Sequence, residues 1–359
     1  MLSAGRFRWF MAAVLLAAFA FSLTGERQPD SRFGYSPNPD GTARFLRELD
    51  KPLFADAGAD AIQKAENRNT FLYRPAYAAH QALYGRPWIV ERQLIGDCVS
   101  WGWAHGVWIA QCVDWEQGLL ESPPAFPSTE AIYGGSRVEA RGRDGSGRSP
   151  VGGYSDGSYG GAAARWVRDW GVIYREVQDN GVDLTSYSGD RAKSWGAYGN
   201  GGQGDNGVLD EAAKAHPCEH VALVTNFDEA AAAIESGYPV AYCGGVGFTS
   251  TRDSDGFCRR SGTWWHCMCF IAVRYGSGDD GNGETDSSGR RGLLCLNSWG
   301  PSASRGPKWP ADQPDGSFWV DEATVNSMLR GEDSFAVGSV QGFAWRDLDH
   351  REWMDEAQP

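Results

Sequence analysis

The sequence is short of positive charge and of long apolar runs. Its 33 Lys and Arg stand against 46 Asp and Glu, which gives a net charge of -13. A surface of that sign repels phosphate backbones and anionic lipid, so we do not expect nucleic acid as a partner. The one long apolar run, residues 9–23, is shorter than the roughly 20 residues that a membrane-spanning helix needs.

The N-terminus nevertheless has the polarity of an export signal. Arg6 and Arg8 precede the apolar run, and Ala18-Phe19-Ala20 offers a small-x-small cleavage site. We therefore expect residues 1–24 to be a signal peptide or, if uncleaved, a short membrane anchor. The protein is then extracytoplasmic or secreted, and it contacts a membrane only if the anchor is retained.

The chain also lacks internal repeats and paired metal-ligand spacing. Histidine occurs six times, and residues 216–220 and 266–269 combine it with cysteine. Neither segment has the paired spacing of a structural zinc site. We therefore expect no metal ion.

What is present is a helical half followed by a sheet-rich half. Residues 25–71 are polar and mixed, with a helix-like stretch at 43–64, and are interpreted as a leader, a linker or a short pro-segment. The main domain is expected over residues 72–345, with a helical part at 72–216 and a sheet-rich part at 217–345. Residues 346–359 form a tail. The predicted fold class is α+β.

Periodicity predicts the individual elements. Apolar positions recur at helical spacing after Asp97. Further helices are expected at 163–170, with Gly171 as the stop, and at 228–236, which ends at Gly237. Strands are expected at 239–246, 266–275, 292–297 and 317–320. Residues 115–160 and 186–216 are rich in glycine and are expected to be loops.

Cys98 is the cysteine best placed to act as a nucleophile. A thiol attacks as the thiolate, and a helix N-terminus lowers a thiol pKa through the helix dipole. Cys98 follows Asp97, the expected N-cap, and so falls in the first turn of a buried helix. With one of the eight cysteines as nucleophile, at most three disulfides can form, and their pairing stays open.

Motifs in the same order along the chain resemble those of papain-like cysteine peptidases. The matching segments are 93–104 around Cys98, 157–161 with the helix and 171–175 that follow, 239–241, 266–275, 296–300 with its Asn-Ser-Trp-Gly motif, and 316–320. The chain therefore resembles a divergent, bacterial-type member of the papain superfamily.

This resemblance implies a two-lobed fold, with a helical lobe first, an antiparallel sheet or barrel second, and the active-site cleft between them. It also implies hydrolysis of a polypeptide substrate through a thioester acyl-enzyme, without a metal or organic cofactor. Cys98 would attack the scissile carbonyl, His266 would take the thiol proton and pass it to the leaving amine, and Asn297 would orient the imidazole.

The resemblance extends to residues around the triad. Gln93 would share an oxyanion hole with the backbone N–H of Cys98. Trp299 would shield the hydrogen bond between His266 and Asn297 from water. The glycine-rich stretches 186–216 and 276–291 are expected to be surface insertions. The residues expected to contact substrate are Gly160, Gly161, Trp265 and Cys267.

Two other functions fit part of the pattern. Cell-wall peptidoglycan amidases and transglutaminase-like enzymes share a leading Cys and His, but they give no reason for the Asn-Ser-Trp-Gly motif. A papain fold kept as a binding or structural module usually loses a catalytic residue, whereas Cys98, His266 and Asn297 are all present. A cysteine endopeptidase is therefore the favoured interpretation.

Overall fold

The structure is a computed structural model that describes residues 32–141, 156–175, 178–179, 182–204 and 207–348. The expected signal segment and most of the expected tail lie outside these residues. The contacts within the chain divide it into two compact units, residues 1–30 and residues 31–359, and only the second unit is described below. None of its described helices is both long enough and apolar enough to cross a membrane.

An antiparallel sheet is built mainly by the second half of the chain. Its strands lie in the order β4 (Val221–Leu223), β9 (Phe335–Val337), β5 (Val240–Arg252), β6 (Cys258–Arg274), β7 (Gly292–Leu296) and β8 (Phe318–Asp321), with β1 (Thr70–Phe71) also paired to β6. Beyond the pair Gly244–His266 the register of β5 and β6 shifts repeatedly. Such irregularities bend and twist a strand pair, and here they begin at the histidine predicted to be catalytic.

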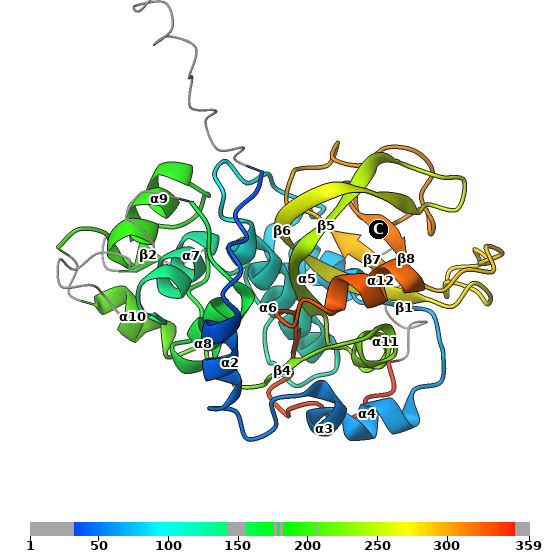
Figure 1. The fold of residues 1–359 in the computed structure, drawn as a ribbon, viewed down its shortest axis with the longest axis horizontal. Coiled ribbons are helices and arrows are strands. Elements are labelled where there is room, and N and C mark those ends of the chain that lie inside the picture. Colours follow the sequence, from blue (N-terminus) through cyan, green and yellow to red (C-terminus); the bar gives the residue numbers. More distant parts are fainter. Residues whose placement is uncertain (1–31, 142–155, 176–177, 180–181, 205–206, 349–359) are drawn as a thin grey trace, which may run out of the picture. The chain divides into compact units, whose positions relative to one another are not determined.

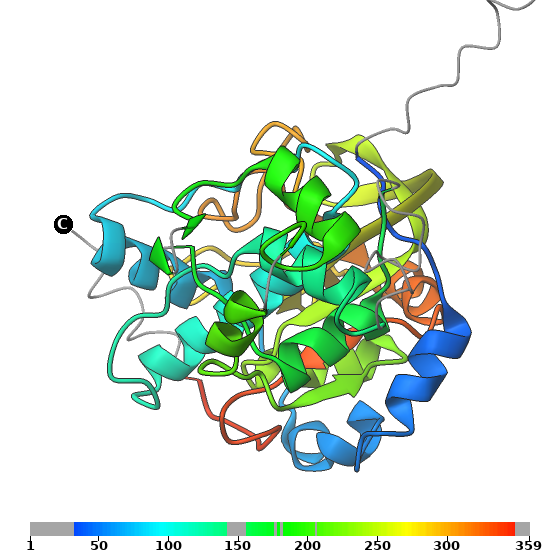
Figure 2. The same ribbon diagram turned by 90° about the vertical axis from the view of Figure 1, so that its left-hand side faces the viewer.

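Helices dominate the first half. They are α5 (Tyr73–Tyr84), α6 (Cys98–Glu116), α7 (Thr129–Arg137), α8 (Gly160–Asp169), α9 (Gly189–Tyr198) and α10 (Val208–Ala213), with a small sheet of β2 (Gln178–Asp179) and β3 (Val182–Asp183). Figure 1 shows α7 to α10 on one side of α6 and the large sheet on the other, and Figure 2 looks onto the helical side. The predicted α+β class is confirmed.

Shorter helices surround these two parts. The helix-like stretch predicted at 43–64 is divided among α2 (Pro39–Leu46), α3 (Phe54–Ala57) and α4 (Ala59–Lys64). On the sheet side lie α11 (Phe227–Glu235) and α12 (Glu322–Leu329). The predicted stops of α8 and α11 are confirmed, because Gly171 and Gly237 have φ of 99° and 89°, the left-handed region that ends helices.

Helix α6 is the central helix, and it is buried along nearly its whole length. One apolar cluster joins its residues Trp108 and Cys112 to the sheet and α11, and a second joins Trp103 to α7 and α8. Gly102 allows close contact with β6, since a Cβ there would lie only 2.8 Å from Cys267 Sγ. The first turn of α6 is thereby held beside the strand that carries His266.

The loop prediction for 115–160 and 186–216 is wrong in part. Helix α7 lies within the first stretch, and α9 and α10 lie within the second. Helix α7 was not predicted because it contains the pair Gly134-Gly135, and glycine has a low helix propensity. Packing explains the glycine: a Cβ on Gly135 would lie 2.0 Å from the Trp166 ring. The stretch 276–291 contains no named helix or strand, as expected.

The predicted strands are confirmed, but β5 and β6 are longer than expected. β6 begins at Cys258 rather than at His266. Residues 259–263 of this strand are exposed, so they lack the alternation of buried and exposed positions by which a half-buried strand is recognised.

Candidate active site

Cys98 is the first residue of α6 and is fully buried. Asp97 occupies the predicted N-cap position, although its side chain makes no capping hydrogen bond. Instead Tyr187 donates its hydroxyl to Asp97 Oδ2 at 2.9 Å. Ser100 Oγ donates to the Asp97 carbonyl at 2.7 Å and closes the first turn.

The Cys98 thiol lies among backbone donors. The N–H groups of Cys267 and Gly34 face the sulfur and favour the thiolate. Burial has the larger effect, and with the neighbouring Cys267 thiol it raises the pKa of the Cys98 thiol well above its usual value. In the state described here the sulfur is therefore protonated at neutral pH.

His266 and Asn297 form the expected pair. His266 Nε2 and Asn297 Oδ1 are 2.9 Å apart, and both residues are buried. The same Oδ1 accepts the N–H of Ser298 at 2.7 Å, which fixes the amide. Because an amide oxygen only accepts, this pairing assigns the imidazole proton to Nε2 and leaves Nδ1 as the basic nitrogen.

Nδ1 of His266 is buried and makes no hydrogen bond within the part of the chain that the structure describes. Burial lowers the pKa of His266 to about 4, although the Asn297 hydrogen bond and the Arg32 backbone act in the opposite direction. No hydrogen bond among the described residues joins this nitrogen to the Cys98 sulfur. His266 and Asn297 are thus paired, Cys98 lies beside Cys267, the residue that follows His266, and the catalytic roles of the three residues stay a prediction.

Aromatic rings enclose the imidazole. The Trp299 ring lies 4.6 Å from the His266 ring, and Trp264 lies 4.7 Å from Trp299. Phe33 approaches His266 edge-on at 6.4 Å. Trp299 is therefore where its predicted shielding role requires it, although the role stays a prediction. Trp264 was missed, yet it shares a strand face with His266 because side chains alternate.

Gln93 ties the loop before Cys98 to the Asn-Ser-Trp-Gly segment. Its backbone N–H donates to the Ser298 carbonyl at 2.9 Å. Its Oε1 accepts from Ser298 Oγ at 2.6 Å, and its Nε2 donates to the Ile95 carbonyl at 2.9 Å. Gln93 is thus held beside the site, and its oxyanion role stays a prediction.

A segment that the sequence did not single out lies across the site. We call residues 32–36 the strap. Gly34 and Tyr35 donate their N–H groups to the Trp265 carbonyl at 3.1 and 3.0 Å. On the other side Ser158 donates to the Gly34 carbonyl at 2.9 Å, and Ser36 donates to the Ser158 carbonyl at 2.8 Å. Figure 1 shows this segment, in dark blue, between the helices and the strands.

The strap fits the site most tightly at Gly34. A Cβ on this residue would lie 1.8 Å from the carbonyl oxygen of Gly96, in the loop that precedes Cys98. At the strap's start, the Trp299 indole Nε1 donates to the Arg32 carbonyl at 3.2 Å. The strap therefore contacts both the loop that precedes Cys98 and the Trp299 ring that packs against His266.

The Tyr35 side chain extends toward a buried carboxyl group. Its hydroxyl hydrogen-bonds Asp333, and its ring lies 6.3 Å from that of Trp265. Burial raises the pKa of Asp333 to about 6, although Thr42 and the backbone of Gly160 and Gly161 favour its ionised form. Asp333 and Tyr35 were missed because no local pattern marks either residue.

Gly160 and Gly161 have a packing role of their own. Their N–H groups donate to the Asp333 carboxylate at 2.8 and 2.7 Å. A Cβ on Gly160 would lie 2.3 Å from the Asp333 carbonyl oxygen, and one on Gly161 would lie 2.8 Å from Thr42 Oγ1. The backbone that pairs with the strap is that of Ser158, so a substrate-binding role for the two glycines stays a prediction.

The residues on either side of His266 face different surroundings. Trp265 is 51% exposed, and its carbonyl accepts two of the four strap hydrogen bonds, from Gly34 and Tyr35. Cys267 is fully buried and lies opposite Cys243 of β5 in the strand register. All eight cysteines are buried free thiols. The described residues include no cluster of His, Cys, Asp and Glu that could hold a metal ion.

The fold that positions these residues is that of papain-like cysteine proteases. The solved structure of xylellain, a cysteine protease from Xylella fastidiosa, is similar with a TM-score of 0.53 and 14% identity, over 88% of this chain and 98% of that one. The two-lobed α+β fold expected from the motifs is confirmed. At this identity the likeness shows the fold alone.

Two further solved structures give lower TM-scores. The proform of the ragweed pollen cysteine protease Amb a 11 gives a TM-score of 0.48 at 11% identity, over 94% of this chain and 88% of that one. Digestive procathepsin L 3 of Tenebrio molitor gives 0.44 at 15% identity, over 91% and 87%. No family model matches the sequence, and no curated protein matches it significantly.

Proposed function

We propose that the protein is a cysteine peptidase that cleaves peptide bonds through a thioester. The observation that carries the proposal is the 2.9 Å pair between His266 Nε2 and Asn297 Oδ1. This pair leaves Nδ1 of His266 as the basic nitrogen. The next residue, Cys267, directs its backbone N–H at the Cys98 sulfur. A thiol at a helix N-terminus beside a histidine oriented by a third residue is a constellation suited to acyl transfer.

The proposed reaction uses only these side chains and water. Cys98 Sγ attacks the scissile carbonyl while Nδ1 of His266 takes the thiol proton. The imidazolium returns that proton to the leaving amine, and the acyl group stays on sulfur as a thioester. Nδ1 then takes a proton from water as the water oxygen attacks the thioester carbonyl. The C–S bond breaks, the carboxylic acid product leaves, and the imidazolium returns its proton to the sulfur.

The proposal includes an inactive state in which the strap covers the site. Four backbone hydrogen bonds hold the strap to Trp265 and Ser158, and the Cys98 pKa is raised chiefly by burial. Residues 25–71 would therefore act as a pro-segment, and displacement of the strap would let the sulfur ionise beside His266. We also propose an exported protein cleaved after Ala20, which N-terminal sequencing of material from outside the cytoplasm would test.

The decisive experiment compares two buried cysteines on α6. Purified protein is assayed on casein and on purified peptidoglycan, before and after limited proteolysis of the leader. Cys98→Ala should abolish casein hydrolysis without loss of folding, whereas Cys112→Ala should retain it. Wild-type turnover by Cys98→Ala would refute the mechanism, and cleavage of peptidoglycan alone would favour an amidase.

The second candidate is a papain fold that binds rather than cleaves. It is favoured by the unmade contact between Cys98 and His266 under the strap. Alkylation separates the two functions once the leader has been removed. Rapid labelling of Cys98 at neutral pH that is lost in His266→Ala supports the peptidase, and slow labelling unaffected by that substitution supports the binding module.

A further inference from the structure

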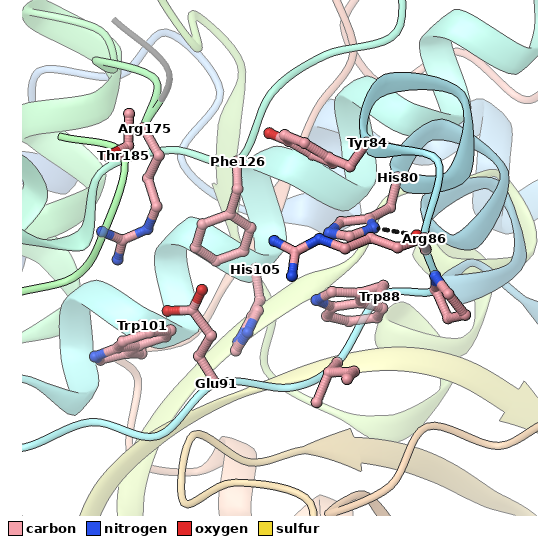
Figure 3. Close-up of a pocket in the computed structure, with 12 residues that line it drawn as sticks. His80, Tyr84, Arg86, Trp88, Glu91, Trp101, His105, Phe126, Arg175 and Thr185 are labelled. Atoms are coloured by element: carbon pink, nitrogen blue, oxygen red, sulfur yellow. Dashed lines mark hydrogen bonds between the residues drawn. The ribbon is translucent and has the colours of Figure 1, made fainter. Parts of the chain in front are cut away.

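A cavity of about 390 Å³ opens on a side of α6 that carries none of the three predicted catalytic residues. It is bounded by the end of α5, the segment 86–91, α6 and the stretches around Phe126 and Arg175 (Figure 3). Its volume falls within the range of small-molecule sites, and aromatic rings make up much of its wall.

The floor of the cavity carries a buried polar side chain without a partner. His105 is 1% exposed and packs against Trp88, Trp101 and Phe126, with ring centroids 6.1, 5.9 and 5.5 Å away. Burial and the Arg175 charge lower the pKa of His105 to about 3, so its ring is neutral. Among the described residues its nitrogens make no hydrogen bond. Because His105 lines the cavity and its ring is neutral, one ring nitrogen can accept a hydrogen bond from a molecule bound there.

Two side chains of opposite charge lie at the mouth of the cavity. Arg86 and Glu91 are both exposed and line the cavity, and within the described chain neither side chain makes an ion pair or a hydrogen bond. Figure 3 shows them reaching in from different sides. The third charge, Arg175, is already paired with Glu130 at 3.1 Å. The mouth thus offers one unpaired cation and one unpaired anion above an aromatic wall.

We propose that this cavity binds a free aromatic amino acid with a polar tip, tyrosine or tryptophan. Its carboxylate pairs with Arg86 and its α-ammonium with Glu91, because a zwitterion complements both charges at once. The ring packs against Trp88 and Phe126. The phenol O–H or indole N–H donates to the unprotonated nitrogen of His105. The site is separate from the proposed peptidase centre and does not depend on its activity.

Calorimetric titration of the full chain with amino acids tests the proposed binding site. All variants are made in the Cys98→Ala protein, called the host, so that hydrolysis plays no part. L-Tyrosine should bind saturably, and L-phenylalanine, which lacks the polar tip, should bind more weakly. Arg86→Gln should weaken L-tyrosine at least about tenfold but leave tyramine, which lacks the carboxylate, unchanged. Glu91→Gln should weaken L-tyrosine similarly but leave 3-(4-hydroxyphenyl)propionate unchanged.

Matched controls are Arg47→Gln and Glu121→Gln, which remove exposed charges without ion pairs elsewhere on the described surface. Both should bind L-tyrosine as the host does. The proposal is overturned if L-tyrosine shows no saturable binding, or if Arg86→Gln and Glu91→Gln leave its dissociation constant unchanged. Binding of N-acetyl-L-tyrosine as tight as that of L-tyrosine would also overturn it, because the ligand would then be a peptide C-terminus.

Discussion

Replacing Gly34 by alanine should uncover Cys98. The new Cβ would lie 1.8 Å from the Gly96 carbonyl oxygen, and a backbone atom cannot move aside as a flexible side chain can. Four backbone hydrogen bonds hold the strap, and at about 1 kcal/mol each they favour the covered state by about 4 kcal/mol. That free energy corresponds to a ratio of covered to open molecules of roughly a thousandfold.

Alkylation of Cys98 by iodoacetamide measures the open population, provided that opening and closing are fast relative to labelling. Gly34→Ala should raise the labelling rate by roughly a hundred- to a thousandfold, with little change in global unfolding. Gly331→Ala is the matched control, because its Cβ would meet its nearest atom at an ordinary 3.6 Å. Mass spectrometry locates the label. Labelling of Gly34→Ala at the wild-type rate would show that the strap does not govern access.

Three further outcomes are expected. Because the pKa of Asp333 is raised from 3.8 to about 6, its contribution to stability is present below pH 4 and is lost as pH rises through 6. Relative to Asp333→Asn, the wild-type unfolding free energy should fall by about 3 kcal/mol from pH 4 to pH 7, which denaturant titration would detect. Asn297→Ala should lower kcat by up to about 10,000-fold with little change in KM, because His266 loses its orienting partner; an unchanged kcat would contradict this. Gly135→Ala should destabilise the fold by about 1–3 kcal/mol through overlap with Trp166, and a melting temperature equal to wild type would exclude that packing argument.

Much of the fold and the pair of His266 and Asn297 could be predicted because the signals are local. The sequence of α6 shows helical periodicity, and the Asn-Ser-Trp-Gly motif is recognisable on its own. The strand after His266 is apolar at consecutive positions, which placed it inside the sheet. Each of these signals lies within one short stretch of sequence.

What was missed depends on contacts between distant segments. The strap pairs through backbone atoms, and Gly34 matters only because Gly96 lies against it in the folded chain. Asp333 is an ordinary polar residue in sequence until folding brings it to the N–H groups of Gly160 and Gly161. Helix α7 was missed because its glycines fit tertiary packing rather than intrinsic propensity.

Burial of both reacting groups has an electrical consequence. With the Cys98 pKa raised and that of His266 lowered to about 4, the covered centre at neutral pH holds a neutral thiol beside a neutral ring. In the proposed mechanism, exposure to water lets one proton pass from the Cys98 sulfur to His266, which creates two charges without changing their sum. The transfer itself neither consumes nor releases a proton, so the solution pH affects the charged pair only where acid protonates the thiolate or base deprotonates the imidazolium.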